Sequence, residues 1–168
     1  MEAYNANQRH FGENKIQEMV QKYEVMPKDI HWHMIGHIQT NKIKYIAPFV
    51  SLVHGVDRPK VLAALNKEAA KVKRVIDCTL QVHIAQEDTK FGFDMSELAQ
   101  IVETLGHYPN VCVRGLMGMA TFTKDQVQIR EEFTALHNAF ETYGPGRGWE
   151  VLSMGMSGDF EIAIEEGS

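Results

Sequence analysis

The sequence predicts an α/β fold of the TIM type, a (β/α) barrel with about six of the eight βα units of a complete barrel. Strand-like segments alternate with helix-like segments along all 168 residues, and this order indicates a parallel sheet. The helical segments are amphipathic, and several strands have one apolar face and one polar or small face. Strands of an open sheet covered on both sides are apolar throughout. A barrel explains the difference, because its apolar faces pack under the helices and its polar faces line the lumen.

The first half of the chain carries the signals of the first three units. Apolar residues in the segment 16–23 follow the i, i+3, i+4, i+7 spacing of an amphipathic helix. Asp57 is expected to cap the next long helix, which has Pro59 in its first turn. The other elements expected here are a helix end at 1–8, strands at 9–14, 30–36 and 49–56, and a short helix at 39–46.

The second half begins with the clearest strand, residues 74–84, whose side chains alternate between an apolar and a polar face. Asp94 and Glu97 have the spacing of a capping box at the start of the following helix. The remaining expected elements are a helix around 98–105, a strand at 111–120, a helix at 125–143, a turn at 144–148, a strand at 150–157 and a short helix at 160–166.

The composition is that of a soluble globular protein, with 44% hydrophobic and 23% charged residues. The net charge of −5 and the lack of a Lys and Arg cluster predict no nucleic-acid partner. No apolar run approaches the roughly 20 residues of a membrane span, and no signal peptide is visible. Cys78 and Cys112 each lie in an apolar run, which fits reduced thiols in the cytoplasm. We therefore expect one cytoplasmic domain over residues 1–168, with no membrane partner.

The segment 152–159 has the composition of an anion-binding site. If its strand runs to residue 157, alternation places Ser153, Gly155 and Ser157 on one face and the methionines between them on the other. Glycine lets backbone N–H groups approach an anion, serine adds hydroxyl donors, and the following helix start adds positive potential. These residues predict an anion site without identifying the anion.

The histidines of the second long strand leave two interpretations open. His31 and His33 alternate on the strand, and His37 lies just beyond it. Two histidines at i, i+2 are able to bind a divalent metal, as in barrel hydrolases. Ordinary hydrogen bonds in the lumen are the favoured interpretation, because no matching Asp or His cluster follows the later strands. Lys90 and Gly92 are expected either beside a site at the strand ends or in solvent.

Four stretches, in order along the chain, together form a specific pattern: FGEN at 11–14, WHMIGHIQTNK at 32–42, RGLMGM at 114–119, and LSMGMS at 152–157 followed by AIEEGS at 163–168. This pattern resembles the pyridoxal phosphate homeostasis proteins over nearly the whole chain. The segments 81–84 and 90–93 fit the same family.

The resemblance implies a barrel like the N-terminal domain of alanine racemase that binds pyridoxal 5′-phosphate (PLP). It implies a carrier or buffer of PLP without established catalytic activity, whose phosphate lies near the last strands. In this chain it assigns part of the phosphate pocket to Ser153, Met154, Gly155 and Ser157. It also implies that Asn14 lies near the cofactor ring and that His37 and Met119 lie in the lumen.

This chain departs from the family pattern at both ends. The family strand that carries the PLP lysine precedes the helix with which this chain begins, and a further strand follows the position of Ser168. The strands seen here are therefore expected to be the second to the seventh of a barrel. We expect such a piece of a family member to bind PLP weakly, to form no imine at the family position, and to expose two sheet edges for self-association.

Two other classes of function remain as alternatives. One is a barrel enzyme, either a racemase-like PLP enzyme or a metal-dependent hydrolase that uses His31 and His33. The other is an interaction role, in which the open sheet edges pair with a partner chain. Bound metal would favour the hydrolase, and a monodisperse monomer would disfavour the interaction role.

Overall fold

The computed structural model describes residues 1–87 and 91–168, so Lys90 lies outside the described residues. In this part of the chain the strands form one six-stranded sheet in the order β1-β2-β3-β4-β5-β6. The strands are β1 (His10–Glu13), β2 (His31–Met34), β3 (Leu52–Val56), β4 (Ile76–Gln81), β5 (Val111–Met117) and β6 (Val151–Ser153). The helices are α1 (Glu2–Asn5), α2 (Ile16–Val25), η1 (Thr40–Lys42), α3 (Ile43–Ile46), α4 (Pro59–Lys71), η2 (Met95–Glu97), α5 (Leu98–Thr104), η3 (Leu105–His107), α6 (Gln126–Tyr143) and α7 (Phe160–Glu165).

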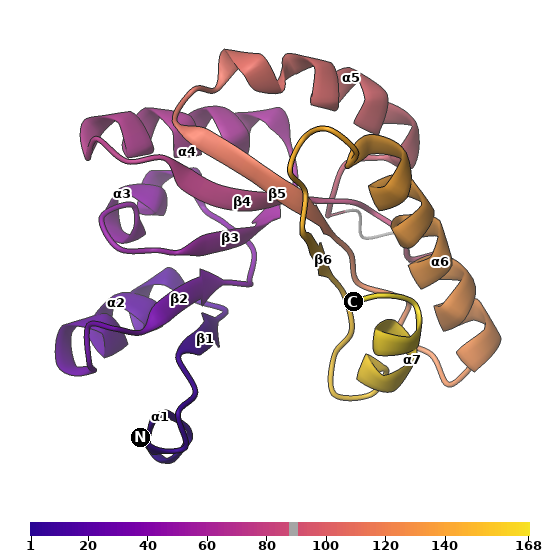
Figure 1. The fold of residues 1–168 in the computed structure, drawn as a ribbon, viewed down its shortest axis with the longest axis horizontal. Coiled ribbons are helices and arrows are strands. Elements are labelled where there is room, and N and C mark those ends of the chain that lie inside the picture. Colours follow the sequence, from indigo (N-terminus) through magenta and orange to yellow (C-terminus); the bar gives the residue numbers. More distant parts are fainter. Residues whose placement is uncertain (88–90) are drawn as a thin grey trace.

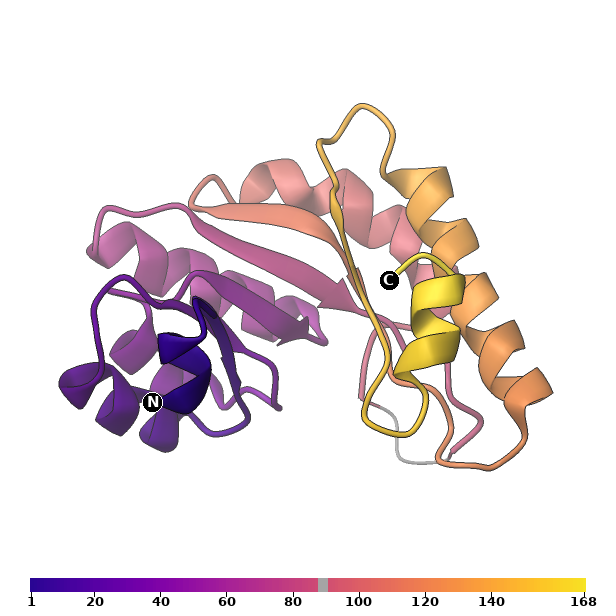
Figure 2. The ribbon, with the colours of Figure 1, turned by 60° about the horizontal axis from the view of Figure 1, so that its bottom comes forward.

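All neighbouring strands pair in parallel, and the sheet curls into a half-barrel with β1 and β6 at its two edges (Figure 1). The larger helices lie around its convex side (Figure 2). Trp32 and Met34 of β2 are buried, whereas His31 and His33, which alternate with them, are more exposed. Apolar side chains thus pack under the helices and polar ones face the concave side, as predicted for barrel strands.

The strands are shorter than their sequence patterns indicate. The clearest pattern covers 74–84, but β4 ends at Gln81, and Val82 forms only an isolated bridge with Phe93. The last pattern covers 150–157, but β6 ends at Ser153. In the sequence, apolar and polar residues continue to alternate beyond the last paired residue. The pattern reflects which side chains are buried, and not only which residues pair in the sheet.

The helix starts confirm one predicted cap and correct another. The Oδ1 of Asp94 accepts a hydrogen bond from the Ser96 N–H at 2.9 Å, and Glu97 Oε2 accepts one from the Asp94 N–H at 2.9 Å, which confirms the capping box. Asp57 does not cap α4, whose N-cap residue is Arg58. Its carboxylate instead accepts hydrogen bonds from Arg58 Nη1 at 2.8 and 2.7 Å. The charged guanidinium thus takes the place of the helix N–H groups that a cap would bind.

The helix predicted for residues 1–8 is limited to α1, which ends at Asn5. Asn7 interrupts it with a φ of 68°, in the left-handed region. The segment is held to the rest of the chain by Asp29, which accepts hydrogen bonds from the Tyr4 hydroxyl and from Arg9 Nε, each at 2.9 Å.

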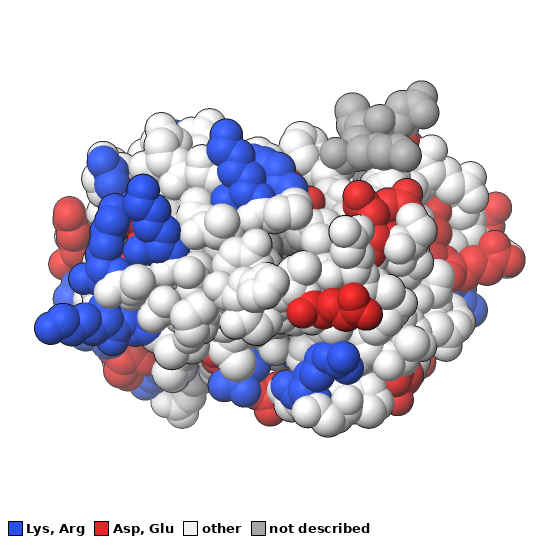
Figure 3. Space-filling view, turned by 90° about the horizontal axis from the view of Figure 1, so that it is seen from above, with Lys and Arg blue, Asp and Glu red and all other residues white. Residues whose placement is uncertain are grey.

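Figure 3 looks down on the helices at the top of Figure 1 and shows charged side chains of both signs. Lys and Arg are more frequent on the left of this view and Asp and Glu on the right, although both signs occur on each side. Of the helices in the described residues, none has the length and apolarity required to cross a membrane.

Candidate functional site

The residues predicted for the site lie at or beyond the carboxyl ends of the strands. Asn14 follows β1, His37 follows β2, Met119 follows β5, and the segment from Met154 to Ser157 follows β6. The carboxyl ends of parallel strands meet at the same edge, which is where barrel proteins place their sites. The structure therefore places these residues near the carboxyl ends of four strands.

Asn14 and His37 line the same cavity, which has a volume of about 330 Å³. The other residues that line it are Lys15, Ile16, Gln17, Gln39 and Lys42. Two lysines, three amides and an imidazole give this cavity hydrogen-bond donors and positive charge. It is suited to a polar, anionic small molecule.

Gly36 allows the loops that carry Asn14 and His37 to approach each other. A Cβ atom at residue 36 would lie 2.2 Å from the carbonyl oxygen of Asn14 and 2.8 Å from its carbonyl carbon. Because these are backbone atoms, no side-chain rotation is able to relieve the overlap. Gly36 thus fixes the position of Asn14 relative to the end of β2.

Replacing Gly36 with alanine is expected to lower the free energy of unfolding by about 1–3 kcal/mol, the usual cost of overpacking. Urea unfolding of G36A and of wild type measures the difference. The matched control is G106A, because a Cβ at Gly106 would meet nothing within 4 Å. Equal stabilities of G36A and G106A would contradict the close approach of the two loops.

His37 is oriented by a buried carboxylate. Its Nδ1 lies 3.3 Å from Oδ2 of Asp57, whose side chain is only 3% exposed and also binds Arg58. The ring of His37 further contacts Phe91, with 4.7 Å between the ring centroids. The side chain of His37 is 43% exposed and lines the cavity, so it is placed to donate or accept a hydrogen bond there.

The segment after β6 differs from the predicted strand. Gly155 has a φ of +90°, which ends the extended chain, so Ser153, Gly155 and Ser157 do not share one strand face as predicted. A Cβ at Gly155 would lie 2.6 Å from Cβ of Ala163, so glycine also permits α7 to pack here. The segment for which the sequence predicts an anion site is therefore a turn between β6 and α7.

Part of this turn is already satisfied by the chain itself. Asp159 Oδ1 accepts a hydrogen bond from the Met156 N–H at 2.5 Å. Ser157 is exposed, and its N–H group has no acceptor among the described residues. Ser153 is half-buried on the concave side, and the side chain of Met154 is buried in the core. The side-chain donors that this segment offers an anion are the hydroxyl groups of Ser153 and Ser157.

Met119 is 43% exposed and lines a second cavity of about 220 Å³, next to Phe91 and Met156. This cavity lies at the carboxyl ends of β4 and β5, and its lining is mainly apolar. It suits the edge of an aromatic ring better than a charged group. Met119 therefore belongs to the rim of the concave face rather than to the cavity shared by Asn14 and His37.

A chain of histidines crosses the concave face and reaches Ser153. His10 Nδ1 lies 3.0 Å from His33 Nε2, and His33 Nδ1 lies 3.0 Å from His54 Nε2. His54 Nδ1 then lies 2.8 Å from the hydroxyl oxygen of Ser153. His31 stacks on His10 with 4.8 Å between ring centroids. The sequence interpretation of lumen hydrogen bonds is confirmed for His33.

His10 and His54 were missed as site residues from sequence, although a signal for them exists. His10 pairs with His31 in the sheet, and Leu52 pairs with His33, so His10 and His54 fall on the face of the other histidines. The described residues contain no group of three or more His, Cys, Asp or Glu side chains arranged to hold a metal ion. The rings bond to one another, and nothing here favours a hydrolase based on His31 and His33.

Burial keeps the inner histidines neutral. Burial, with a smaller contribution from His33, lowers the pKa of His54 from 6.5 to about 4. Burial also lowers the pKa of His33, with further contributions from His10 and His31. Both inner rings are therefore uncharged at neutral pH and act as hydrogen-bonding groups rather than as cations.

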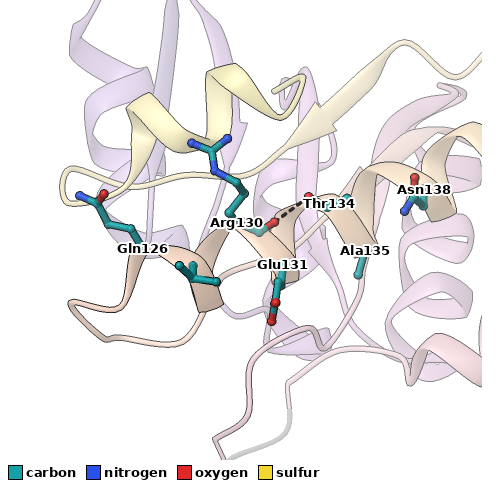
Figure 4. Close-up of a pocket in the computed structure, with 7 residues that line it drawn as sticks. Gln126, Arg130, Glu131, Thr134, Ala135 and Asn138 are labelled. Carbon is teal, nitrogen blue, oxygen red and sulfur yellow. Dashed lines mark hydrogen bonds between the residues drawn. The ribbon is translucent and has the colours of Figure 1, made fainter.

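A larger hollow of about 530 Å³ lies outside the barrel, on the outer side of α6 (Figure 4). Its one arginine, Arg130, points toward α7, where it pairs with Glu165 and Glu166. Thr134 donates a hydrogen bond to Glu166 at 2.8 Å. These side chains join α6 to α7, so the hollow offers no free positive charge to a ligand and is not the site.

The chain matches the family model described as the N-terminal domain of alanine racemase over residues 1–166. A pyridoxal phosphate homeostasis protein of Aquifex aeolicus is 38% identical over 172 residues, which cover 99% of this chain and 75% of that protein. The protein of the same name from Schizosaccharomyces pombe is 34% identical and covers 100% of this chain and 73% of its own length.

Solved structures agree with these relatives. PipY of Synechococcus elongatus with PLP bound has a TM-score of 0.87 at 29% identity, over 99% of this chain and 80% of that one. PipY without PLP has a TM-score of 0.90 at 31% identity, with the same coverage. An alanine racemase of Clostridium difficile, at a TM-score of 0.73 and 9% identity, covers 94% of this chain and 41% of its own and shares the fold alone. This chain belongs to the family of pyridoxal phosphate homeostasis proteins, built on the fold of the alanine racemase N-terminal domain.

Proposed function

We propose that this chain binds PLP without a covalent bond on the concave side of its sheet and takes part in PLP homeostasis as a carrier rather than as an enzyme. The observation that carries the proposal is the match to PipY with PLP bound, which extends over 99% of this chain. The names of the curated relatives support the same role.

The donors present at the carboxyl edge fit a phosphate ester. A phosphate group accepts several hydrogen bonds and carries up to two negative charges. Ser153 and Ser157 supply hydroxyl donors, and Gly155 keeps the turn free of a side chain at the point where α7 begins. We assign the phosphate to this turn, with Met154 and Gly155 contributing backbone.

The ring of the cofactor is assigned to the region between the two cavities of the rim. Asn14 and His37 supply hydrogen-bonding groups in one cavity, and Met119 supplies an apolar contact in the other. PLP itself supplies an aldehyde that reacts with amines and a ring that withdraws electrons. The residues of this chain bind and orient it, and His37 is held for this purpose by Asp57.

PLP binding tests the proposal. Titration of PLP into the protein, followed by absorbance and fluorescence, is expected to show one saturable site. S153A is expected to weaken binding by about tenfold, which corresponds to the loss of one hydrogen bond to a charged group. S51A is the control, because Ser51 directly precedes β3 and therefore lies at the amino ends of the strands, away from the proposed site.

Borohydride reduction followed by mass spectrometry tests the non-covalent mode. We expect no stoichiometric PLP adduct on any lysine. An adduct on Lys15 or Lys42, which line the cavity with Asn14, would contradict this mode while supporting PLP binding. Failure of the wild-type chain to bind PLP at all would contradict the proposed function.

The proposal also covers where the protein acts and what it contacts. We place it in the cytoplasm, where Cys78 and Cys112 stay reduced; both are free, and burial raises the pKa of the Cys78 thiol. No nucleic-acid partner is proposed. The edges of β1 and β6 are the surfaces through which a second copy would pair, and light scattering at several concentrations tests this association.

A further inference from the structure

The histidine chain on the concave face connects an exposed ring to the serine of the proposed phosphate site. Its four members come from four strands, His10 from β1, His33 from β2, His54 from β3 and Ser153 from β6. His10 is exposed, His33 is partly buried, and His54 is 9% exposed. The three contacts, at 3.0, 3.0 and 2.8 Å, thus lead from solvent into the interior.

Each contact between two of these groups holds a single hydrogen. A neutral imidazole has one N–H donor and one bare nitrogen acceptor, so a ring that donates on one side accepts on the other. With His33 and His54 neutral, fixing the hydrogen at one contact therefore fixes it at every contact. Two arrangements result: all donors point toward Ser153, or all point toward His10.

The two arrangements differ at both ends. When the donors point toward Ser153, its oxygen accepts from His54 Nδ1, and its own hydroxyl hydrogen is free for a ligand. His10 then donates from Nδ1 and presents a bare Nε2 to solvent. When the donors point toward His10, the Ser153 hydroxyl donates to His54, and Nδ1 of His10 is occupied as an acceptor.

We propose that a phosphate group bound at Ser153 selects the arrangement whose donors point toward Ser153, and thereby couples ligand binding to proton uptake at His10. The inference rests on the proposed function, because it takes the phosphate of PLP as the ligand of Ser153. An unprotonated phosphate oxygen only accepts, so Ser153 must donate to it and must receive its own hydrogen bond from His54.

Proton uptake at His10 follows from the selected arrangement. A proton from solvent adds to the bare Nε2 of His10, while the existing N–H on Nδ1 continues to donate to His33. In the opposite arrangement the second N–H of His10 would point at an N–H of His33, which disfavours protonation. By linkage, a proton on His10 strengthens phosphate binding to the same extent as phosphate favours the proton.

The titratable groups that face the hydrogen-bonded histidines are other histidines. His31 and His33 face His10; His10, His31 and His54 face His33; His33 and Ser153 face His54. In the described part of the chain no carboxylate forms an ion pair with any of these rings. The ring outside the hydrogen-bonded chain, His31, provides a matched control because it stacks on His10 without joining the chain.

Calorimetry with pyridoxine 5′-phosphate tests the coupling. This ligand has the phosphate of PLP but no aldehyde, so imine formation adds no protons. Titration in two buffers of different ionisation enthalpy gives the protons taken up per ligand. We expect wild type and H31Q to take up more protons than H10Q. We also expect wild-type affinity to rise about fivefold from pH 8 to pH 6 relative to H10Q, because the proton and the ligand then favour the same arrangement.

The ligand and the variants have their own controls. Pyridoxine, which lacks the phosphate, is expected to show no difference between wild type and H10Q. Equal proton uptake by wild type and H10Q would overturn the coupling and leave the proposed function standing. Absence of binding of both PLP and pyridoxine 5′-phosphate to wild type would overturn the proposed function and the coupling together.

Nitrogen-15 NMR of the wild-type histidine rings tests the arrangement without any substitution. With pyridoxine 5′-phosphate bound, Nδ1 of both His33 and His54 is expected to carry the hydrogen, and Nε2 of both to be bare. A hydrogen on Nε2 of His54 in the bound state would overturn the proposal.

Discussion

Replacing Gly115 with alanine is expected to lower the free energy of unfolding by about 3 kcal/mol or more and to separate β6 from β5. Gly115 lies in β5 opposite Val151, with a φ of +149°, which L side chains rarely adopt. An added Cβ would lie 1.9 Å from the carbonyl oxygen of Val151 and 3.0 Å from Cε2 of Phe140. Backbone strain and steric overlap therefore act together at this residue.

Loss of the pairing between β5 and β6 is expected to disturb the proposed site as well. Only three residue pairs join β5 to β6, and the last of them is Met117 with Ser153. The Gly118 N–H also donates to the carbonyl oxygen of Ser153 at 3.1 Å. If β6 moves away from β5, Ser153 leaves the ring of His54. G115A is thus expected to lose PLP binding as well as stability.

G146A separates the two causes of this effect. Gly146 also has a positive φ, of +78°, but a Cβ there would meet nothing within 4 Å. It is expected to cost about 1 kcal/mol from backbone strain alone. Urea unfolding of G115A, G146A and wild type measures the difference. A G115A variant no less stable than G146A would show that β6 does not depend on the close approach of Val151.

The order of elements could be predicted from the sequence because it depends on local patterns. The spacing of apolar residues in 16–23 and the capping box at Asp94 are properties of single segments, and the structure confirms both. The parallel sheet then follows from strict alternation of strands and helices. Six strands in sequential order are the outcome of these local signals.

The details of the site could not be predicted, because they depend on distant contacts. Asp57 has the sequence context of a cap, but Arg58 and His37 compete for its carboxylate. Alternation in 150–157 continues through Gly155, where the chain turns because α7 packs against it. His54 lies 99 residues from Ser153, so only the curl of the sheet brings the two together.

Lowering the pH from about 7.5 to 5 is expected to reduce the free energy of unfolding by about 2 kcal/mol through His54 alone. The pKa of His54 is about 4 in the folded chain, against 6.5 for an ordinary histidine, mainly because burial disfavours its charge. The unfolded chain therefore binds the proton first as the pH falls. Stability is fully present above pH 6.5, falls between 6.5 and 4, and levels off below 4.

Urea unfolding at the two pH values measures this loss in wild type, H54Q and H31Q. H54Q is expected to lose most of the pH dependence, and H31Q is expected to keep it. Burial also lowers the pKa of His33, so a smaller loss of the same sign remains in H54Q. Carboxylates contribute little in this range, because those with lowered pKa, such as Glu166, titrate below their usual 4.5. If H54Q is too unstable to compare, NMR titration of the wild-type His54 ring replaces it, and a midpoint near 6.5 would show that the ring is not held neutral by burial.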